Sequence, residues 1–237
     1  MSPEIVITGF PKCGTTALMR AFGADPELQV LKKPNGAVEL TWPLIQTIKI
    51  PPHDGKILAH KFTAYIFNED ALEYLAGINP NSAIVLCIRD PKKSLISWHR
   101  MHQSIAKSGR NKQHLAYRER EFYATCTVSE YYERYAQRRL RYDKHFRTLL
   151  SIVPKERVVV VSQERMAKDM DAVSSLIKSI AKGEEITTAP ASDNKDNYKS
   201  YADKSGTVLD VVIERKLNRV QKRLHNMIAK SGVRTCI

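Results

Sequence analysis

A short loop near the start of the chain has the residue types that bind phosphate. Gly9–Thr16 reads GFPKCGTT, and it lies between the β-branched run Glu4–Gly9 and a helical pattern over Thr15–Phe22. At such a strand–loop–helix junction, backbone N–H groups and the helix dipole favour a bound anion. We therefore predict a P-loop-like phosphate site here. Its candidate residues are Lys12, Cys13, Gly14, Thr15 and Thr16.

The position of the lysine distinguishes this loop from that of nucleotide triphosphatases. Their pattern is G-x-x-x-x-G-K-[ST]. Gly9 and Gly14 keep the glycine spacing, but Thr15 stands in place of the lysine, and the basic residue is Lys12. We also find no convincing magnesium-binding acid at the end of the strand pattern Arg157–Val161. A nucleotide or sugar kinase with an atypical loop remains an alternative, which these two features disfavour.

A second motif follows the most apolar strand pattern, Ser82–Ile88. Arg89 comes directly after it, and Ser97 lies eight positions later within the helical pattern Lys92–His102. A guanidinium group can bind a phosphate through two parallel hydrogen bonds. The two motifs together resemble the signature of sulfotransferases that use 3′-phosphoadenosine 5′-phosphosulfate (PAPS).

The resemblance implies roles for these residues. Lys12 and the loop around it would hold the 5′-phosphosulfate, and Arg89 with Ser97 would hold the 3′-phosphate. The sulfuryl group would pass in line to a hydroxyl or amine of the acceptor. The desulfated nucleotide, 3′-phosphoadenosine 5′-phosphate (PAP), would be the product, and no metal would be required. The place of the family's last donor-binding loop is taken by an irregular stretch. Its candidate residues are Lys195, Lys199, Ser200 and Tyr201.

Further segments resemble the glycan-modifying, heparan sulfate-type branch of that family. KILAHKFTAYIF is similar to the segment that carries a second active-site lysine, here Lys61. RYDKHFRTLLSIVPKERVVVVSQERM is similar to a helix–strand–turn of the family, although Ser162–Arg165 departs from its usual final residues. The resemblance favours a carbohydrate hydroxyl or amine as the acceptor, the surplus of basic residues is compatible with an anionic one, and a small alcohol or a lipid remains an alternative.

Two side chains are candidates for the general base. Glu39 precedes an apolar-aromatic run, as does the glutamate of the glycan branch, whereas His60 resembles the strand-end histidine of the cytosolic small-molecule branch. Either can accept a proton if its surroundings bring its pKa toward neutrality. The match of Lys61 to the glycan branch favours Glu39, and the choice stays open. His99 and His102 lie in the same region and are candidate acceptor contacts.

The order of elements predicts an α/β fold. Strand patterns alternate with helical ones, which is typical of a parallel sheet covered by helices on both faces. We expect a single domain over residues 1–237, with an irregular loop at 184–206 and a final helix at 207–229. Ligands of such folds bind at the carboxyl ends of the strands. Those ends are predicted at Gly9, His60, Ile88 and Val161.

Composition restricts the class of protein further. The formal net charge is +13, and the basic surplus lies in 100–147 and 195–237, which is compatible with an anionic partner. Aromatic residues are not interleaved with these basic runs in an RNA-reading pattern, which argues against the alternative of a nucleic-acid binder. The four cysteines form no metal-binding or CxxC spacing. No apolar run is long enough to span a membrane. We expect a cytoplasmic protein, and the oligomeric state is open.

Overall fold

A six-stranded sheet forms the centre of the molecule, with all strands parallel. The computed structural model describes residues 4–33, 36, 39–47, 55–79, 81–109, 114–184 and 209–237. The strand order is β2-β3-β1-β4-β5-β6. The strands are β1 (Ile5–Gly9), β2 (Leu28–Val30), β3 (Ile57–Lys61), β4 (Ala83–Ile88), β5 (Val158–Ser162) and β6 (Arg234–Cys236). The predicted α/β fold with a parallel sheet is confirmed.

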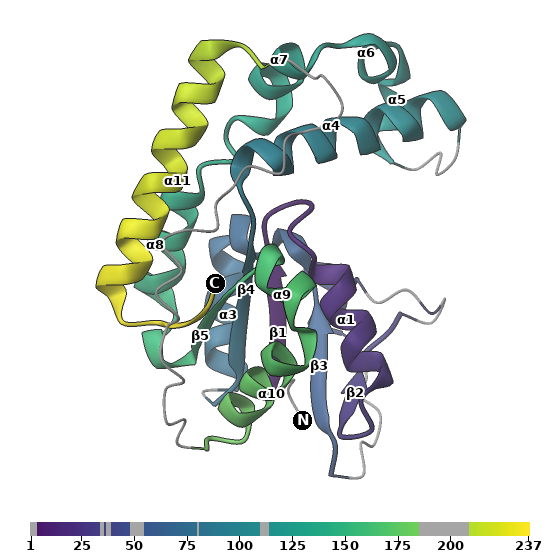
Figure 1. The fold of residues 1–237 in the computed structure, drawn as a ribbon. Helices are drawn as coiled ribbons and strands as arrows, with labels where there is room; N and C mark the ends of the chain where they lie inside the picture. The colour runs from purple at the N-terminus through teal and green to yellow at the C-terminus, as the bar shows by residue number, and fades with distance from the viewer. Residues whose placement is uncertain are drawn as a thin grey trace.

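Helices cover both faces of the sheet, as Figure 1 shows. One face carries α1 (Thr15–Ala24), α9 (Gln163–Lys168) and α10 (Met170–Ala181), and the other carries α3 (Glu69–Ile78) and α8 (Tyr142–Ile152). The long helix α11 (Val211–Ser231) packs along α8. All four inner strands are buried along their whole length, which explains the largely apolar sequences of β1, β4 and β5.

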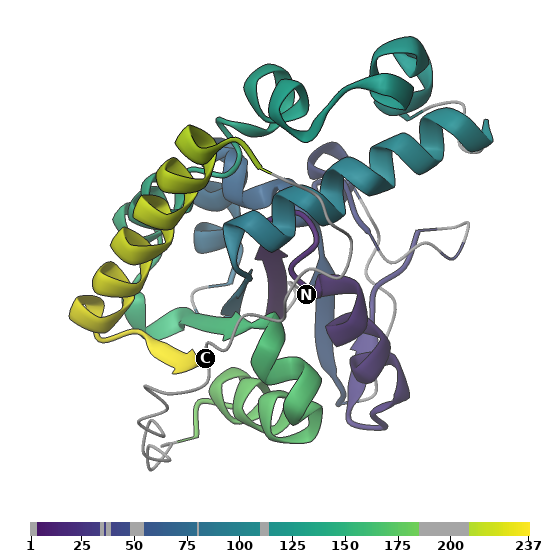
Figure 2. The same cartoon turned by 45° about the horizontal axis from the view of Figure 1, so that its top comes forward.

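A further helical layer lies over the carboxyl ends of the strands. The helix α4 (Pro91–Ser108) crosses above the loop that follows β1 (Figures 1 and 2). It packs against α5 (Leu115–Arg118), α6 (Arg120–Thr125) and α7 (Val128–Tyr131), and a π-helical turn follows at Tyr132–Ala136. Where α4 packs against the other helices of this layer lies an aromatic cluster. It consists of Trp98, His102, Tyr123, Tyr131 and Tyr135.

Element ends mostly follow the local signals. Asn68 caps α3, since its side chain accepts a hydrogen bond from the N–H of Ala71. The helix then continues through Gly77 to Ile78. The final helix begins at Val211 rather than at 207. Of the predicted irregular loop at 184–206, all but residue 184 lies outside the described residues.

Short elements complete the fold. They are α2 (Trp42–Ile45), the 3₁₀ turns Thr63–Phe67 and Lys155–Arg157, and the edge strands β2 and β6. Within the described part of the chain, none of the helices combines the length and apolar character that a membrane crossing requires.

Candidate active site

The loop after β1 has the backbone geometry of an anion site. Lys12 has φ of 65° and Gly14 has φ of 86°, both in the left-handed region. The helix α1 then begins at Thr15 with no side-chain cap and no acidic residue in its first turn. The first N–H groups of a helix have no partner within it. In this loop they are available for an anion, which the helix dipole also favours.

Neighbouring elements hold the same loop in place through hydrogen bonds. The N–H of Phe10, in the loop, donates to the carbonyl of Cys87, on β4, at 3.2 Å. The hydroxyl of Ser94, on α4, donates to the carbonyl of Pro11. Nη1 of Arg89 donates to the carbonyl of Lys12 at 3.3 Å. The carbonyls of Pro11 and Lys12 are thus both bonded by side chains from outside the loop, which fixes its path beside the start of α1.

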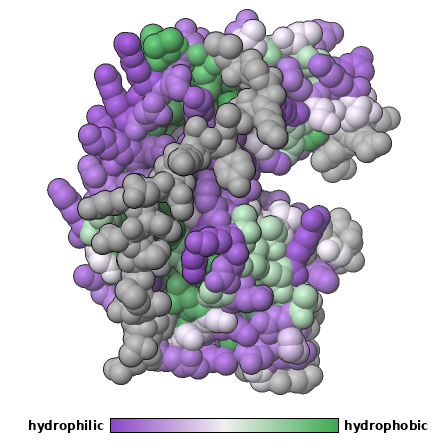
Figure 3. Space-filling view, in the orientation of Figure 1, coloured by the Kyte–Doolittle hydropathy of each residue, from purple (hydrophilic) through white to green (hydrophobic). Residues whose placement is uncertain are grey.

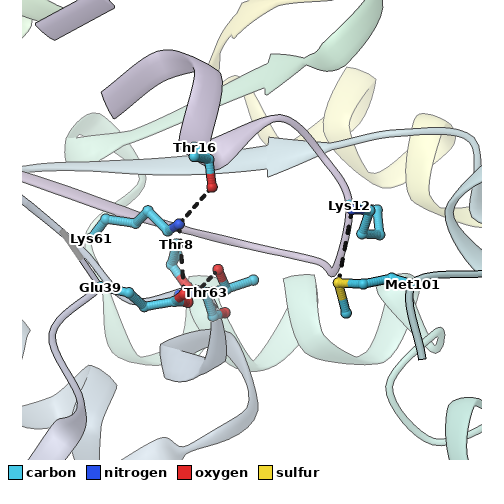
Figure 4. A network of polar contacts seen from close by, with 7 residues as sticks. All are labelled: Thr8, Lys12, Thr16, Glu39, Lys61, Thr63 and Met101. Carbon is cyan, nitrogen blue, oxygen red and sulfur yellow. Dashed lines mark hydrogen bonds and ion pairs between the residues drawn. The ribbon is translucent and has the colours of Figure 1, made fainter. Parts of the chain in front are cut away.

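Lys61 extends from the end of β3 toward the same loop (Figure 4). Its Nζ donates to Oγ1 of Thr16 at 2.9 Å and lies 3.7 Å from Oε2 of Glu39. The Lys61 side chain is 4% exposed, whereas that of Glu39 is 46% exposed. Oε1 of Glu39 accepts hydrogen bonds from the N–H of Thr63 at 3.3 Å and from its hydroxyl at 2.9 Å. The structure thus brings Thr16, Lys61 and Glu39 together.

Lys12 approaches from the opposite side of the loop. Its Nζ lies 3.9 Å from Sδ of Met101, on α4 (Figure 4). Burial of the ammonium group lowers the pKa of Lys12, and the positive charge of Arg89 lowers it further. Two cations held close together favour an anion between or beside them. Ser97 lies one helical turn beyond Ser94 on α4 and is half-buried.

His60 points away from these groups. Neighbouring residues of a strand face opposite sides of the sheet, and Lys61 faces Thr16. His60 is fully buried, with Nε2 at 3.1 Å from the hydroxyl of Tyr65. Burial lowers the pKa of His60 to about 3. The geometry therefore favours Glu39 over His60 as the candidate base.

The remaining candidates have other surroundings. Cys13 is fully buried, with Sγ at 3.7 Å from the hydroxyl of Tyr142, and burial raises the pKa of its thiol to about 12. His99 and His102 are buried within the helical layer, where His99 bonds the carbonyl of Cys126. The candidates Lys195, Lys199, Ser200 and Tyr201 lie outside the described residues. Sequence reasoning missed Thr63 and Ser94, whose roles come only from distant contacts.

Comparisons with known proteins identify the family of the chain and proteins of similar fold. The sulfotransferase domain family matches residues 2–187. A sulfotransferase structure from Alicyclobacillus acidocaldarius is similar, with a TM-score of 0.58, 18% identity and coverage of 97% of this chain and 96% of that one. The mouse sulfotransferase SULT7A1 complexed with PAP has a TM-score of 0.51 and 16% identity, with coverage of 97% and 84%. No curated protein sequence matches the chain.

Proposed function

The chain belongs to the sulfotransferase family, and from this premise we propose that it transfers a sulfuryl group from PAPS to a carbohydrate hydroxyl or amine. The observation that carries the proposal is the convergence of Lys61, Thr16 and Glu39 beside an uncapped helix N-terminus. A positive charge, hydrogen-bond donors for a phosphate and a carboxylate thereby lie in one site.

In this proposal the donor's 5′-phosphosulfate binds at the loop after β1. The N–H groups at the start of α1 would bind its phosphate, with Thr16 and Lys61 beside them. Arg89 and Ser97 would bind the 3′-phosphate, since both lie between the end of β4 and the second turn of α4. The PAP in the mouse neighbour supports a nucleotide of this kind. In this role Cys13 contributes its backbone, because its side chain packs inward against Tyr142.

The transfer is a single displacement at sulfur. Glu39 takes the proton of the acceptor hydroxyl as the acceptor oxygen bonds to sulfur. The bond between sulfur and the phosphate oxygen breaks, and that oxygen gains negative charge. Lys12 and Lys61 stabilise this charge from two sides, and PAP leaves. Positioning and fixed charges supply most of the rate enhancement in the related phosphoryl transfers.

Two features support Glu39 in this role. Its carboxylate is accessible, unlike the His60 ring, so an acceptor can reach it. The bonds from Thr63 and the nearby Lys61 also fix its direction. A glutamate in this position accords with the resemblance to the glycan branch, from which the carbohydrate acceptor is inferred. The cytoplasmic location and the absence of a metal requirement stay predictions from the sequence.

Calorimetric titration with PAP, in EDTA and without magnesium, tests the donor site. We expect micromolar binding that AMP does not reproduce and that Arg89→Ala weakens more than about tenfold, because a charged phosphate contact is lost. Arg118→Ala, at an exposed position on α5, is the control and should bind as the parent does. Tighter binding of ATP with magnesium would contradict the proposal and favour the kinase. Turnover with PAPS and desulfated polysaccharides then tests the acceptor.

A further inference from the structure

The outer face of α11 carries an unusual concentration of positive charge. Its buried residues, such as Leu217 and Leu224, recur on one side, and the opposite side is exposed. We call that exposed side, with its six bases, the α11 stripe. The stripe consists of Arg215, Lys216, Arg219, Lys222, Arg223 and Lys230. Figure 3 shows hydrophilic side chains along this edge of the molecule.

The stripe is almost without acidic partners in the described part of the chain. Arg223 alone has an ion pair there, at 3.6 Å from Oδ2 of the buried Asp143. That carboxylate also lies 3.7 Å from Nε of Arg141. At the end of α10 the pattern is different, since Lys178 and Lys182 are paired with acids. The charge of the stripe therefore stays largely uncompensated, and like charges three and four residues apart destabilise a helix.

The stripe runs along most of the helix. Arg215 and Lys230 are 15 residues apart, which corresponds to about 22 Å along a helix. The neighbouring helix α8 adds the exposed bases Lys144 and Arg147. A linear array of this kind matches an extended polyanion better than a small anion, since many weak contacts act together and release counterions.

A shallow pocket adjoins the stripe and indicates which polyanion fits. It has a volume of about 420 Å³ and is lined by Asn218, Gln221, Lys222, His225 and Asn226. Three amide side chains beside a lysine suit sugar hydroxyls together with an anionic substituent. Among the described residues that form the stripe and line the pocket there is no Phe, Tyr or Trp, the side chains on which nucleic-acid bases stack.

We propose that the α11 stripe and its amide pocket form a docking surface for an anionic polysaccharide bearing sulfate or carboxylate groups. The surface holds a polymeric acceptor on the enzyme while a different part of the same polysaccharide molecule is sulfated in the active site. The proposal rests on the carbohydrate acceptor of the proposed function. None of the residues of the candidate active site belongs to this surface.

Binding of fluorescent dextran sulfate to the full chain tests the surface. The test variant is Arg219→Glu with Lys222→Glu, and the control is Arg20→Glu with Lys168→Glu, exposed bases on α1 and α9 whose replacement changes the net charge equally. We expect the stripe variant to bind at least about tenfold more weakly with a smaller salt dependence, and the control to bind within about twofold of the parent. Neutral dextran should not bind.

Three outcomes would overturn the proposal. If both variants bound dextran sulfate equally more weakly than the parent, only the net charge would matter. If neither variant bound it more weakly, the stripe would not be the docking surface. Tighter binding of a single-stranded oligonucleotide than of dextran sulfate, dependent on the same two residues, would assign the surface to nucleic acid. PAP affinity, measured in parallel, should be unchanged in both variants. Loss of PAP binding in the parent itself would count against the donor site and not against the stripe.

Discussion

Lys61 places its side-chain nitrogen 2.9 Å from the hydroxyl oxygen of Thr16. This contact joins the end of one strand to the helix that follows the neighbouring strand. Lys61 ends β3, and Thr16 lies in the first turn of the helix that follows β1. The pairing of β1 with β3, which sets Ile7 beside Lys61, fixes this approach. The register of a buried sheet thereby positions a nearly buried cation at a phosphate-binding helix start.

Replacing Lys61 by methionine should lower turnover more than it lowers donor affinity. The methionine side chain keeps the packing but removes the charge that stabilises the leaving phosphate oxygen. We expect kcat to fall by about two to three orders of magnitude, with PAP binding weakened less than about tenfold. Lys168→Met, at an exposed position on α9, is the control and should behave as the parent. Equal losses in kcat and in PAP affinity would instead assign Lys61 to ground-state binding.

Glu39→Gln and His60→Gln together separate the two candidate bases. The amide of Gln cannot take a proton, so Glu39→Gln should lower kcat by about 10² to 10⁴ while PAP still binds. His60 lies on the other side of its strand, bonded to Tyr65, and the His60 variant should keep its kcat within about fivefold of the parent. The measurement is turnover at saturating donor, with folding checked by circular dichroism. The reverse order of losses would make His60 the base.

The sequence predicted the elements with strong local patterns. Buried β-branched runs such as Ala83–Ile88 predict inner parallel strands, and a helix-capping residue such as Asn68 predicts a helix start. The family membership confirms the predicted sulfotransferase enzyme class. The edge strands β2 and β6 were missed, because three residues carry too little periodicity to be recognised.

The geometry of the site could be predicted only in part. Adjacent loops after parallel strands were expected to meet, and those after β1, β3 and β4 do so through Thr16, Lys61 and Arg89. Which of two adjacent residues faces the loop could not be known in advance, since a shift of one residue reverses the face. The bonds of Ser94 and Thr63 depend on tertiary contacts that no spacing encodes.

Folding stability should depend on pH through His60. Burial holds the pKa of His60 at about 3, below its ordinary value of 6.5, so the unfolded chain takes up the proton first as the pH falls. The stabilisation that neutral, buried His60 contributes is complete above pH 6.5. It is lost progressively as the pH falls toward 3, and the free energy of unfolding is lower by about 2 kcal/mol at pH 5. Urea unfolding at pH 7, 6 and 5 measures this loss. His60→Gln should reduce the slope by about one proton, and an unchanged slope would mean that the ring is not held neutral.

Arg157 supports the connection between α3 and β4. Its buried guanidinium donates to the carbonyls of Ala76 at 2.9 Å, Asn79 at 2.7 Å and Ser82 through Nε at 3.0 Å. Arg157→Met leaves these carbonyls without their donor, and we expect a loss of about 3 kcal/mol in the free energy of unfolding. Arg118→Met, on the surface, should change it by less than about 0.5 kcal/mol. Urea titration compares the two, and equal small changes would contradict the assigned role.

Gly14→Ala should damage the donor site with little effect on the rest of the fold. A Cβ at this position would lie 2.7 Å from Cε of Met166, a contact that the flexible methionine side chain can relieve. The alanine would also have to adopt φ of 86°, which costs a residue with a side chain about 1 to 2 kcal/mol. Relief of this backbone strain shifts the loop and moves the N–H groups at the start of α1, so PAP binding should weaken more than about tenfold. Gly23→Ala is the matched control, since a Cβ there meets nothing within 4 Å. It lies in the last turn of the same helix and should stabilise the fold by about 0.5 kcal/mol without changing PAP affinity. Retention of full PAP affinity in the Gly14 variant would show that the loop tolerates a side chain, and the anion site would then have to be placed elsewhere.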